Sequence, residues 1–207
     1  MPIPTTNATD ELPAVNQILA SVGQAPVTTL DQTNPDVAIA YDTLLQVSKE
    51  VQAEGWTFNQ EFEFEIVTNN SKEYEIPNNM LQIDFSESYK GNIDPVRRDG
   101  KIYDRYNHTF EIGDTAGDTF KVDIVWFFDW VDLPAPVQNY IVSKAATITA
   151  QRIIGDPQLI QTLQQREALA RANALEYECN QGDFTIFGHP EGNRHYTSYK
   201  PYTALQR

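Results

Sequence analysis

Residues 10–30 read DELPAVNQILASVGQAPVTTL, and residues 34–59 read NPDVAIAYDTLLQVSKEVQAEGWTFN. In the first stretch apolar side chains recur every three or four residues, a spacing that places them on one face of an α-helix. We expect Asp10 to cap this helix and Gly23 to end it, because glycine readily takes the left-handed backbone that follows a helix. The expected buried face of this helix consists of Val15, Ile18, Leu19 and Val22.

The second stretch predicts a longer helix. Asn34 is a suitable cap, Pro35 fits the first helical position, and Gly55 supplies the stop. An amphipathic helix pair cannot bury its apolar stripes alone, so both helices need further elements to pack against. The expected buried face of the longer helix consists of Val37, Tyr41, Leu44, Leu45, Ser48 and Val51.

After Trp56 the apolar period changes from 3.6 to 2, the period of a half-buried β-strand. The strongest later strand covers residues 120–126, and Asp99 with Gly100 predicts a two-residue hairpin turn of the primed kind. The middle of the chain therefore predicts an antiparallel sheet. The first strand alternates Phe58, Phe62, Phe64 and Ile66 with Asn59, Glu61, Glu63 and Glu65. Other strands are expected at residues 74–76, 81–85, 96–98, 101–103 and 109–112.

Helical spacing returns at Pro134 and predicts one helix that stops at Gly155. Asp156 and Pro157 then cap and start another helix. We expect the first and last helix pairs to pack together, because neither pair can bury its stripe alone. The expected inward residues are Val137, Tyr140, Ile141, Ala145, Ile148 and Arg152, followed by Ile160, Leu163, Glu167, Ala170, Ala174 and Tyr177.

The predicted fold class is α+β, with a helical bundle from the N- and C-terminal helix pairs and an inserted antiparallel β-sheet layer. The expected domains are a discontinuous helical bundle of residues 10–55 and 132–180 and a β domain of residues 56–131. Residues 181–207 are expected to form an extended aromatic C-terminal arm. Its five aromatic rings need a surface to bury against, either the chain's own helices or a neighbouring molecule.

Composition excludes several classes of protein. The chain has 207 residues and 41% hydrophobic residues, which is typical of one or two globular domains. No apolar run approaches the roughly 20 residues that span a bilayer, and the N-terminus lacks a signal-peptide pattern, so we expect no membrane insertion. A single cysteine, Cys179, allows neither an internal disulfide nor a zinc cluster built from cysteines.

The formal net charge of −14 is concentrated in the N-terminal half. Residues 10–94 hold fifteen acidic residues and three lysines, a balance of −12 that leaves −2 for the rest. Such a surface repels phosphate, which argues against tight nucleic-acid binding and is otherwise explained by solubility.

Several motifs occur in an order that resembles one known family. VNQILASVGQAPVTTL precedes a helix ending in EGWTFN, followed by GKIYDR at residues 100–105 and DLPAPVQNYIVSKAA at residues 132–146. RIIGDPQLIQTLQQREALARANALEYE comes last, at residues 152–178. Together they resemble the tail tubular protein A family, the head-to-tail adaptor proteins of autographivirus-type short-tailed bacteriophages (podoviruses). The resemblance covers most of the chain, but residues 180–207 carry no matching motif.

The resemblance implies a structural virion protein without enzymatic activity or cofactors, made in the host bacterial cytoplasm and built into the phage tail. It implies a ring of twelve copies between the capsid portal protein and the tail nozzle protein, tail tubular protein B, with tail fibre protein attached near that junction. Double-stranded DNA would pass through the ring during ejection without specific binding. Acidic side chains along the bore would let the duplex slide.

Two sets of residues are candidate contacts in such an assembly. Cations around the predicted hairpin can hold an acidic surface of the next copy, which fixes register and speeds encounter. Aromatic and arginine side chains of the arm suit contact with the portal or a neighbour, since tyrosine and arginine are favoured interface anchors. The first set is Arg97, Arg98, Lys101 and Arg105, and the second is Phe184, Phe187, Tyr196, Tyr199, Tyr202 and Arg207.

An alternative function is an envelope polysaccharide or peptidoglycan hydrolase carried in the tail. Glu61, Glu63 and Glu65 are expected on one strand face, with neighbours about 6 to 7 Å apart. This overlaps the carboxylate separation of inverting glycosidases, although any strand with one solvated face shows the same alternation. A neck-completion or tail-terminator protein of another phage type is a third possibility.

No metal site is predicted. His108, His189 and His195 lack the spacing of a helical zinc pair. Asp114 and Asp118 in GDTAGD could touch a calcium ion, but a hairpin turn is the better interpretation because the spacing is not that of a calcium loop.

Overall fold

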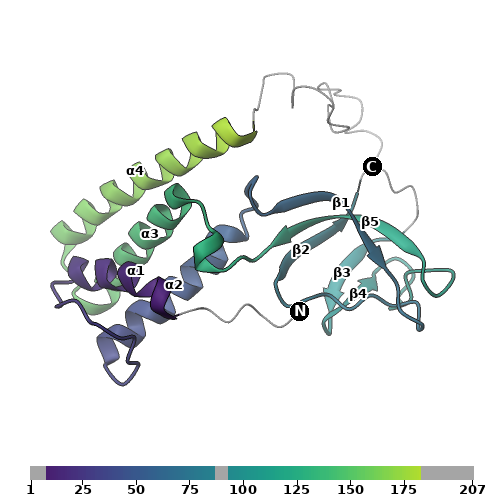
Figure 1. Cartoon of the computed structure of the whole chain (residues 1–207), viewed down its shortest axis with the longest axis horizontal. Helices are drawn as coiled ribbons and strands as arrows, with labels where there is room; N and C mark the ends of the chain where they lie inside the picture. Colours follow the sequence, from purple (N-terminus) through teal and green to yellow (C-terminus); the bar gives the residue numbers. More distant parts are fainter. Residues whose placement is uncertain (1–7, 87–92, 183–207) are drawn as a thin grey trace.

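The computed structural model describes residues 8–86 and 93–182. Within them a helical half and a β half lie at opposite ends of an elongated molecule (Figure 1). Two helices precede the strands and two follow them, which confirms the predicted α+β class. The elements are α1 (Ala8–Ser21), α2 (Pro35–Gln52), β1 (Gln60–Val67), β2 (Met80–Phe85), β3 (Pro95–Arg98), β4 (Lys101–Asp104), β5 (Thr119–Trp126), the 3-10 turn η1 (Trp130–Asp132), α3 (Ala135–Ile153) and α4 (Pro157–Gly182).

The helix stops predicted at glycine are confirmed. Gly23, Gly55 and Gly155 have φ angles of 76°, 77° and 71°, in the left-handed region. After α1 the N–H of Gln24 donates to the carbonyl of Leu19 at 3.0 Å, a bond of the Schellman motif. Glycine is therefore needed at these ends for its backbone conformation.

Two of the three predicted caps are confirmed. The Asn34 side chain accepts the N–H of the residue two positions later at 3.1 Å, and Asp156 does the same at 3.0 Å. The prediction for Asp10 is wrong, because α1 begins at Ala8 and Asp10 lies in its first turn. Several polar residues precede the apolar stripe, so periodicity alone does not fix which residue begins the helix.

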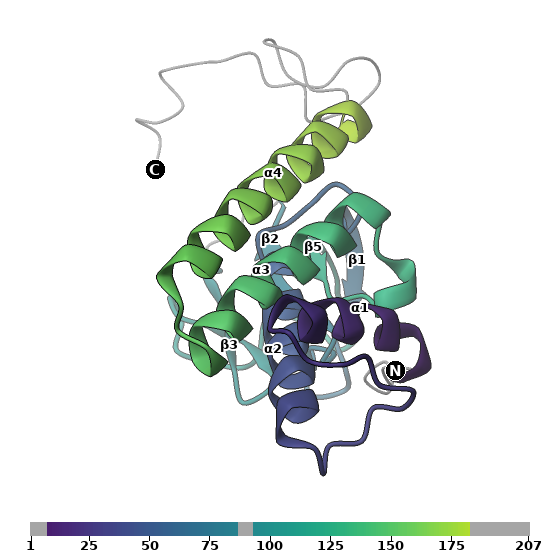
Figure 2. The ribbon, with the colours of Figure 1, turned by 90° about the vertical axis from the view of Figure 1, so that its left-hand side faces the viewer.

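α3 is the central helix of the helical half and contacts α1, α2 and α4 (Figure 2). Its Tyr140 and Ile141 side chains are fully buried. The first and last helix pairs therefore share one core, as predicted, although a division into separate domains at the predicted bounds stays a prediction. Of the predicted inward residues of α3, Arg152 is exposed and donates to the Thr43 hydroxyl at 2.8 Å.

α4 packs through a narrow stripe, with most of its surface exposed. Leu163 and Ala174 are its buried apolar residues, and the other predicted inward residues are half-buried. The buried core of the helical half contains Ala14, Val15, Ile18, Leu19, Val37, Ala40, Tyr41, Leu44, Val47, Val51, Trp56, Leu133, Val137, Tyr140, Ile141, Val142, Ala145, Ala146 and Ala174.

The β half has two small antiparallel sheets around a second core. β5 is the central strand of the order β1-β5-β2, and β3 pairs with β4. Asp99 and Gly100 have φ angles of 50° and 73°, so the predicted primed hairpin turn is confirmed. The buried residues of this core are Ile66, Ile76, Met80, Ile102, Ile112, Val122 and Ile124.

Two predicted strands, residues 74–76 and 109–112, are not strands. Each forms a single isolated bridge, Glu75 with Lys101 and Thr109 with Asp104. The Thr109 hydroxyl accepts the N–H of Glu111 at 3.1 Å, which turns the chain instead of extending a ladder.

A β-bulge interrupts β1. Glu61 pairs with Ile124 and Phe64 pairs with Val122, so two residues of β1 oppose one residue of β5. Within the bulge Glu63 has a φ of 53°. The predicted alternation therefore fails at the start of the strand, because one extra residue reverses which face the following side chains occupy.

Buried amide side chains join the two halves. Asn59, which is 1% exposed, accepts the N–H of Trp56 at 2.8 Å and donates to the carbonyls of Gln52 and Trp126 at 2.8 Å each. The buried Gln52 side chain both donates to and accepts from the backbone of Phe128. The end of α2 and the end of β5 are thus held together by hydrogen bonds from which water is excluded.

The C-terminal part of α4 also contacts this junction. Glu178 accepts from the backbone N–H of Thr57 at 2.8 Å and from its hydroxyl at 2.5 Å. Arg171 lies 3.5 Å from Glu54 and donates to the Tyr140 hydroxyl at 3.1 Å. α4 therefore braces the connection between α2 and β1 along its last turns.

Candidate assembly surfaces

The β3–β4 hairpin carries all four cations predicted as inter-subunit contacts, but two of them are paired within the chain. Lys101 lies 2.5 Å from Glu73, and Arg105 donates through Nε to Asp94 at 2.8 Å. The hydrogen bond from Lys101 to Glu73 raises the pKa of the lysine. The predicted set consists of Arg97, Arg98, Lys101 and Arg105.

Arg97 and Arg98 have no ion pair with any residue in the described ranges. Arg97 donates to the carbonyl of Met80 at 2.9 Å. The Arg98 guanidinium lies 4.0 Å from the centre of the Tyr103 ring, and that ring packs edge-on against Phe110 with centroids 4.9 Å apart. Both guanidinium groups are held in place by the hairpin and keep their charge available to a partner.

The hairpin nevertheless does not form a broad positive patch. The exposed Asp99 follows Arg98 in the turn, and Glu73 and Glu75 flank Lys101. The charge that the hairpin offers is therefore that of individually placed guanidinium groups and not of a long-range positive field.

The edge strand β1 presents apolar side chains that sequence periodicity did not predict as exposed. Phe62 is 53% exposed and Val67 is 57% exposed, while the intervening Ile66 is 1% exposed. The bulge turns Phe62 out of the core to which simple alternation assigned it. No sequence signal marks this bulge, because nothing in the row of Glu and Phe distinguishes Glu63 from its neighbours.

The outer face of the same sheet is rich in carboxylates. Glu65 pairs across the strands with Lys121, and Lys121 lies 3.1 Å from Glu63. Asp84 and Asp123 are directly opposite each other, an arrangement that is unfavourable for like charges. The Asp123 carboxylate accepts the backbone N–H of Glu63 at 2.9 Å. This hydrogen bond from the bulge partly offsets the repulsion between the two aspartates.

The three glutamates expected on one strand face do not share a face. Glu61 is opposite the core residue Ile124, whereas Glu65 is opposite Lys121 on the outer face. Glu63 forms an ion pair with that lysine. The predicted row of three carboxylates on one face is therefore wrong, because the bulge sets Glu61 apart from Glu63 and Glu65, which both lie beside Lys121.

Two hollows of the described structure differ in the chemistry of their linings. A groove of about 420 Å³ between α1, α3 and α4 has no acidic, histidine or cysteine side chain in its lining. A hollow of about 430 Å³ in the β half is lined by four acidic residues, Asp104, Glu111, Asp114 and Asp118. Although burial acts in the opposite direction on Asp104, backbone hydrogen bonds keep its pKa below the ordinary value, which is unsuited to a proton donor at neutral pH.

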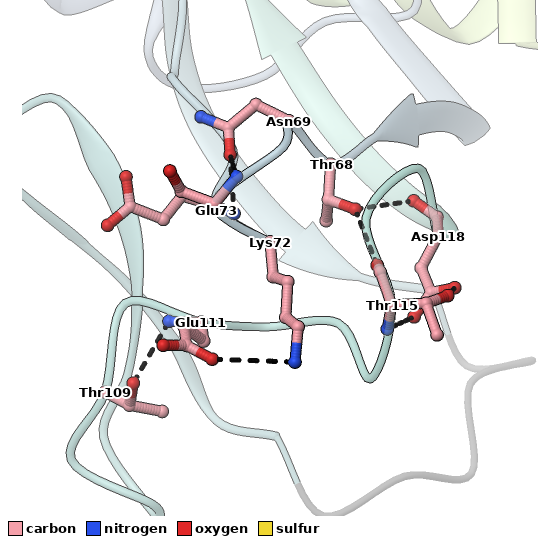
Figure 3. A network of polar contacts seen from close by, with 9 residues as sticks. Thr68, Asn69, Lys72, Glu73, Thr109, Glu111, Thr115 and Asp118 are labelled. Carbon is pink, nitrogen blue, oxygen red and sulfur yellow. Dashed lines mark hydrogen bonds and ion pairs between the residues drawn. The ribbon is translucent and has the colours of Figure 1, made fainter.

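The GDTAGD segment forms a closed turn (Figure 3). Asp118 accepts from the Thr115 N–H at 2.8 Å and from its hydroxyl at 2.5 Å, and these bonds lower the pKa of Asp118. Lys72 lies 3.9 Å from Glu111 across the same network. Among the described residues no three His, Cys, Asp or Glu side chains form a group that could hold a metal ion.

One buried and one half-buried carboxylate, Glu11 and Asp129, were missed by sequence reasoning. Glu11 is 2% exposed, and its Oε2 has no hydrogen-bond partner among the described residues. Burial raises its pKa, the hydrogen bond from Tyr41 opposes this, and the charge of Asp129 raises it further. The pKa of Asp129 is also raised, by burial and by the nearby Asp132.

Several sequence-predicted residues lie outside the described ranges, namely Phe184, Phe187, His189, His195, Tyr196, Tyr199, Tyr202 and Arg207.

A comparison with protein families matches residues 12–184 to the model of the tail tubular protein family. The matched segment runs from α1 through both sheets to the end of α4. The chain belongs to the tail tubular protein family. A comparison with curated proteins found no match.

Membership makes this tail tubular protein a structural component of a bacteriophage tail. In the described part of the tail tubular protein, none of the helices combines the length and apolarity required to cross a bilayer.

Proposed function

We propose that this tail tubular protein is the subunit of an adaptor ring, of the twelve-fold kind implied by the family resemblance, that connects the capsid portal to the tail nozzle protein. The observation that carries the proposal is the family match over residues 12–184, which includes both halves of the molecule. Tail fibre protein attaches near the nozzle side in this proposal, and the duplex passes through the ring without specific binding.

Formation of a closed ring requires two unlike surfaces on each copy that meet head to tail. The hairpin with Arg97 and Arg98 and the acidic outer face around β1 are two such unlike surfaces, which supports the proposal. In the ring, the four hairpin cations face the next copy, and Lys101 and Arg105 additionally hold the hairpin in shape.

The arm of residues 181–207 is proposed to contact the portal or a neighbouring copy. It follows directly after α4, whose last turns are fixed to the junction by Glu178 and Thr57. Its aromatic and arginine side chains, named in the sequence analysis, are suitable anchors. Acidic side chains of the body would line the passage for DNA, because like charge keeps the duplex from adhering.

The proposal is tested by mixing the purified protein with portal alone and with nozzle protein alone. An adaptor binds both, and a neck-completion or tail-terminator protein of another phage type does not have both affinities. Binding is measured by co-sedimentation and by imaging of the complexes. Failure to bind either the portal or the nozzle contradicts the proposed function.

A further inference from the structure

The starting observation is the β1 edge surface, defined by Phe62, Glu65 and Val67. Two of its side chains are apolar and more than half exposed, and Glu65 is exposed on the outer face of the sheet. Glu65 forms no ion pair within the described residues. Its cross-strand neighbour Lys121 is paired with Glu63, so the Glu65 carboxylate can accept a further cation from a partner that covers the exposed apolar side chains.

The partner does not extend the sheet by adding a strand. β1 is an edge strand of the order β1-β5-β2, but its bulge between Glu61 and Phe64 breaks the row of backbone groups that a further strand would need. Bulges and charged side chains are common means of preventing edge-to-edge pairing. Contact at this edge is therefore made by side chains.

The opposite side of the β half has the complementary chemistry. Arg98 lies over the Tyr103 ring, and Tyr106 is 67% exposed on the loop that follows β4. Arg97 is also exposed but lies on the other face of β3, opposite Ile102. Arginine held on an aromatic ring keeps its outward donors free for a carboxylate. The hairpin surface is defined by Arg98 and Tyr106.

The two surfaces lie on opposite sides of the β half. β1 contacts β5, β5 contacts β2, β2 contacts β3, and β3 contacts β4. Glu65 lies on the outer face of the β1-β5-β2 sheet opposite Lys121, and Arg98 pairs with Lys101 on the face of the hairpin that is opposite to the face of the core residue Ile102. Opposite placement of unlike surfaces is what repeated head-to-tail contact between copies requires.

We infer that the β1 edge surface of one copy binds the hairpin surface of the next copy, with Glu65 facing Arg98 and with Phe62 and Val67 packing around Tyr106. The inference rests on the proposed ring function and specifies which surfaces form its lateral contact. Charge complementarity identifies the occupant as a second copy, because the edge carries carboxylates and the hairpin carries the two arginines without an ion pair.

The test is a charge exchange measured on the full chain in the presence of portal. Arg98→Glu and Glu65→Arg are each expected to raise the protein concentration needed for ring formation by about tenfold or more, because each places like charges together. The variant carrying both changes is expected to regain wild-type assembly. Lys49→Glu, a charge reversal on the exposed side of α2, is the matched control and leaves assembly unchanged.

The outcomes separate this inference from the proposed function. Arg98→Glu also removes the contact with the Tyr103 ring. Glu65→Arg tests the same contact between copies while leaving the hairpin intact. Rings that form equally well with either single change overturn the inference and leave the adaptor function standing. Single variants that weaken assembly without recovery in the double variant overturn the Glu65–Arg98 pairing. A wild-type chain that makes no ring on the portal overturns the proposed function.

Discussion

In the helical half every described residue with a positive φ is a glycine, whereas in the β half four other residues adopt it. Those residues are Glu63, Lys72, Asp99 and His108. Non-glycine residues in this region are unfavourable and persist only where the surroundings hold them. The β half also exposes Phe62, Val67 and Tyr106. The difference shows that irregular backbone and exposed apolar side chains occur together in the β half, which is why the proposed contacts between copies are placed there.

The largest effect is expected from a substitution that breaks the connection between the two halves. Asn59→Ala leaves the Trp56 N–H and the carbonyls of Gln52 and Trp126 without their partner in a buried place. We expect a loss of about 3 kcal/mol in the free energy of unfolding, measured by urea denaturation. Asn70→Ala, at an exposed asparagine, is the control and changes little.

Hydrogen exchange on the Asn59→Ala variant shows whether the halves are coupled. If the junction joins them, amides of α3 and β5 both lose protection. Loss of protection in β5 alone would mean that the helical half is stable independently of the junction.

A smaller effect distinguishes the two faces of β1. Ile66→Thr places a hydroxyl in the β core and is expected to cost about 2 kcal/mol. Val67→Thr, one residue later and 57% exposed, is expected to stay within about 0.5 kcal/mol of the wild type. Thermal unfolding of both variants measures the difference, and equal losses would contradict the assignment of faces.

The hairpin turn gives a test of conformational strain. The methyl group added in Gly100→Ala would lie in open space, but the φ of 73° at this position disfavours any residue with a side chain. We therefore expect a loss of about 1 kcal/mol in the free energy of unfolding. Asp99→Asn is the control, because asparagine also tolerates a left-handed backbone. Unchanged stability in Gly100→Ala would show that the turn relaxes into another type.

The smallest expected effect has the opposite sign. Glu11→Gln removes a buried charge while keeping an acceptor for Tyr41, so stability at neutral pH is expected to rise by about 1 kcal/mol. Asp42→Asn, at an exposed position of α2, is the control. A loss of stability in Glu11→Gln would show that the carboxylate has a partner that compensates its burial.

The raised pKa of Glu11 also sets a pH dependence. The fold binds the Glu11 proton more tightly than the unfolded chain, so stability rises as pH falls from neutral towards the ordinary value of 4.5. The raised pKa of Asp129 acts in the same direction. The pKa values of Asp104 and Asp118 are lowered, so the stability that these carboxylates contribute is lost as the pH falls below their ordinary pKa of 3.8. Urea denaturation at several pH values between 7 and 5 measures this dependence. The free energy of unfolding is expected to change less with pH in Glu11→Gln than in the wild type.

Sequence patterns predicted the helical half well. The stripes of α1, α2 and α3 and the stops at Gly23, Gly55 and Gly155 follow from local spacing and backbone preference. The beginning of α1 was placed too late, because neighbouring polar residues are equally suitable caps.

Prediction failed where non-local pairing decides the structure. The bulge at Glu63 depends on its register with β5, and no local pattern contains that register. The ion pairs of Lys101 and Arg105 likewise join residues ten or more positions apart, so a cluster of cations in the sequence overstated the free positive charge. The burial of Glu11 was missed because acidic residues in a first helical turn are usually solvated.

The central claim is that copies of this chain meet through unlike surfaces to form a ring on the portal. The most direct measurement is the mass and image of complexes formed by the purified chain with portal. We expect a closed ring of copies around an open centre, seated on the portal. A portal that carries no bound chain, or only scattered single copies at saturating concentration, would contradict the account.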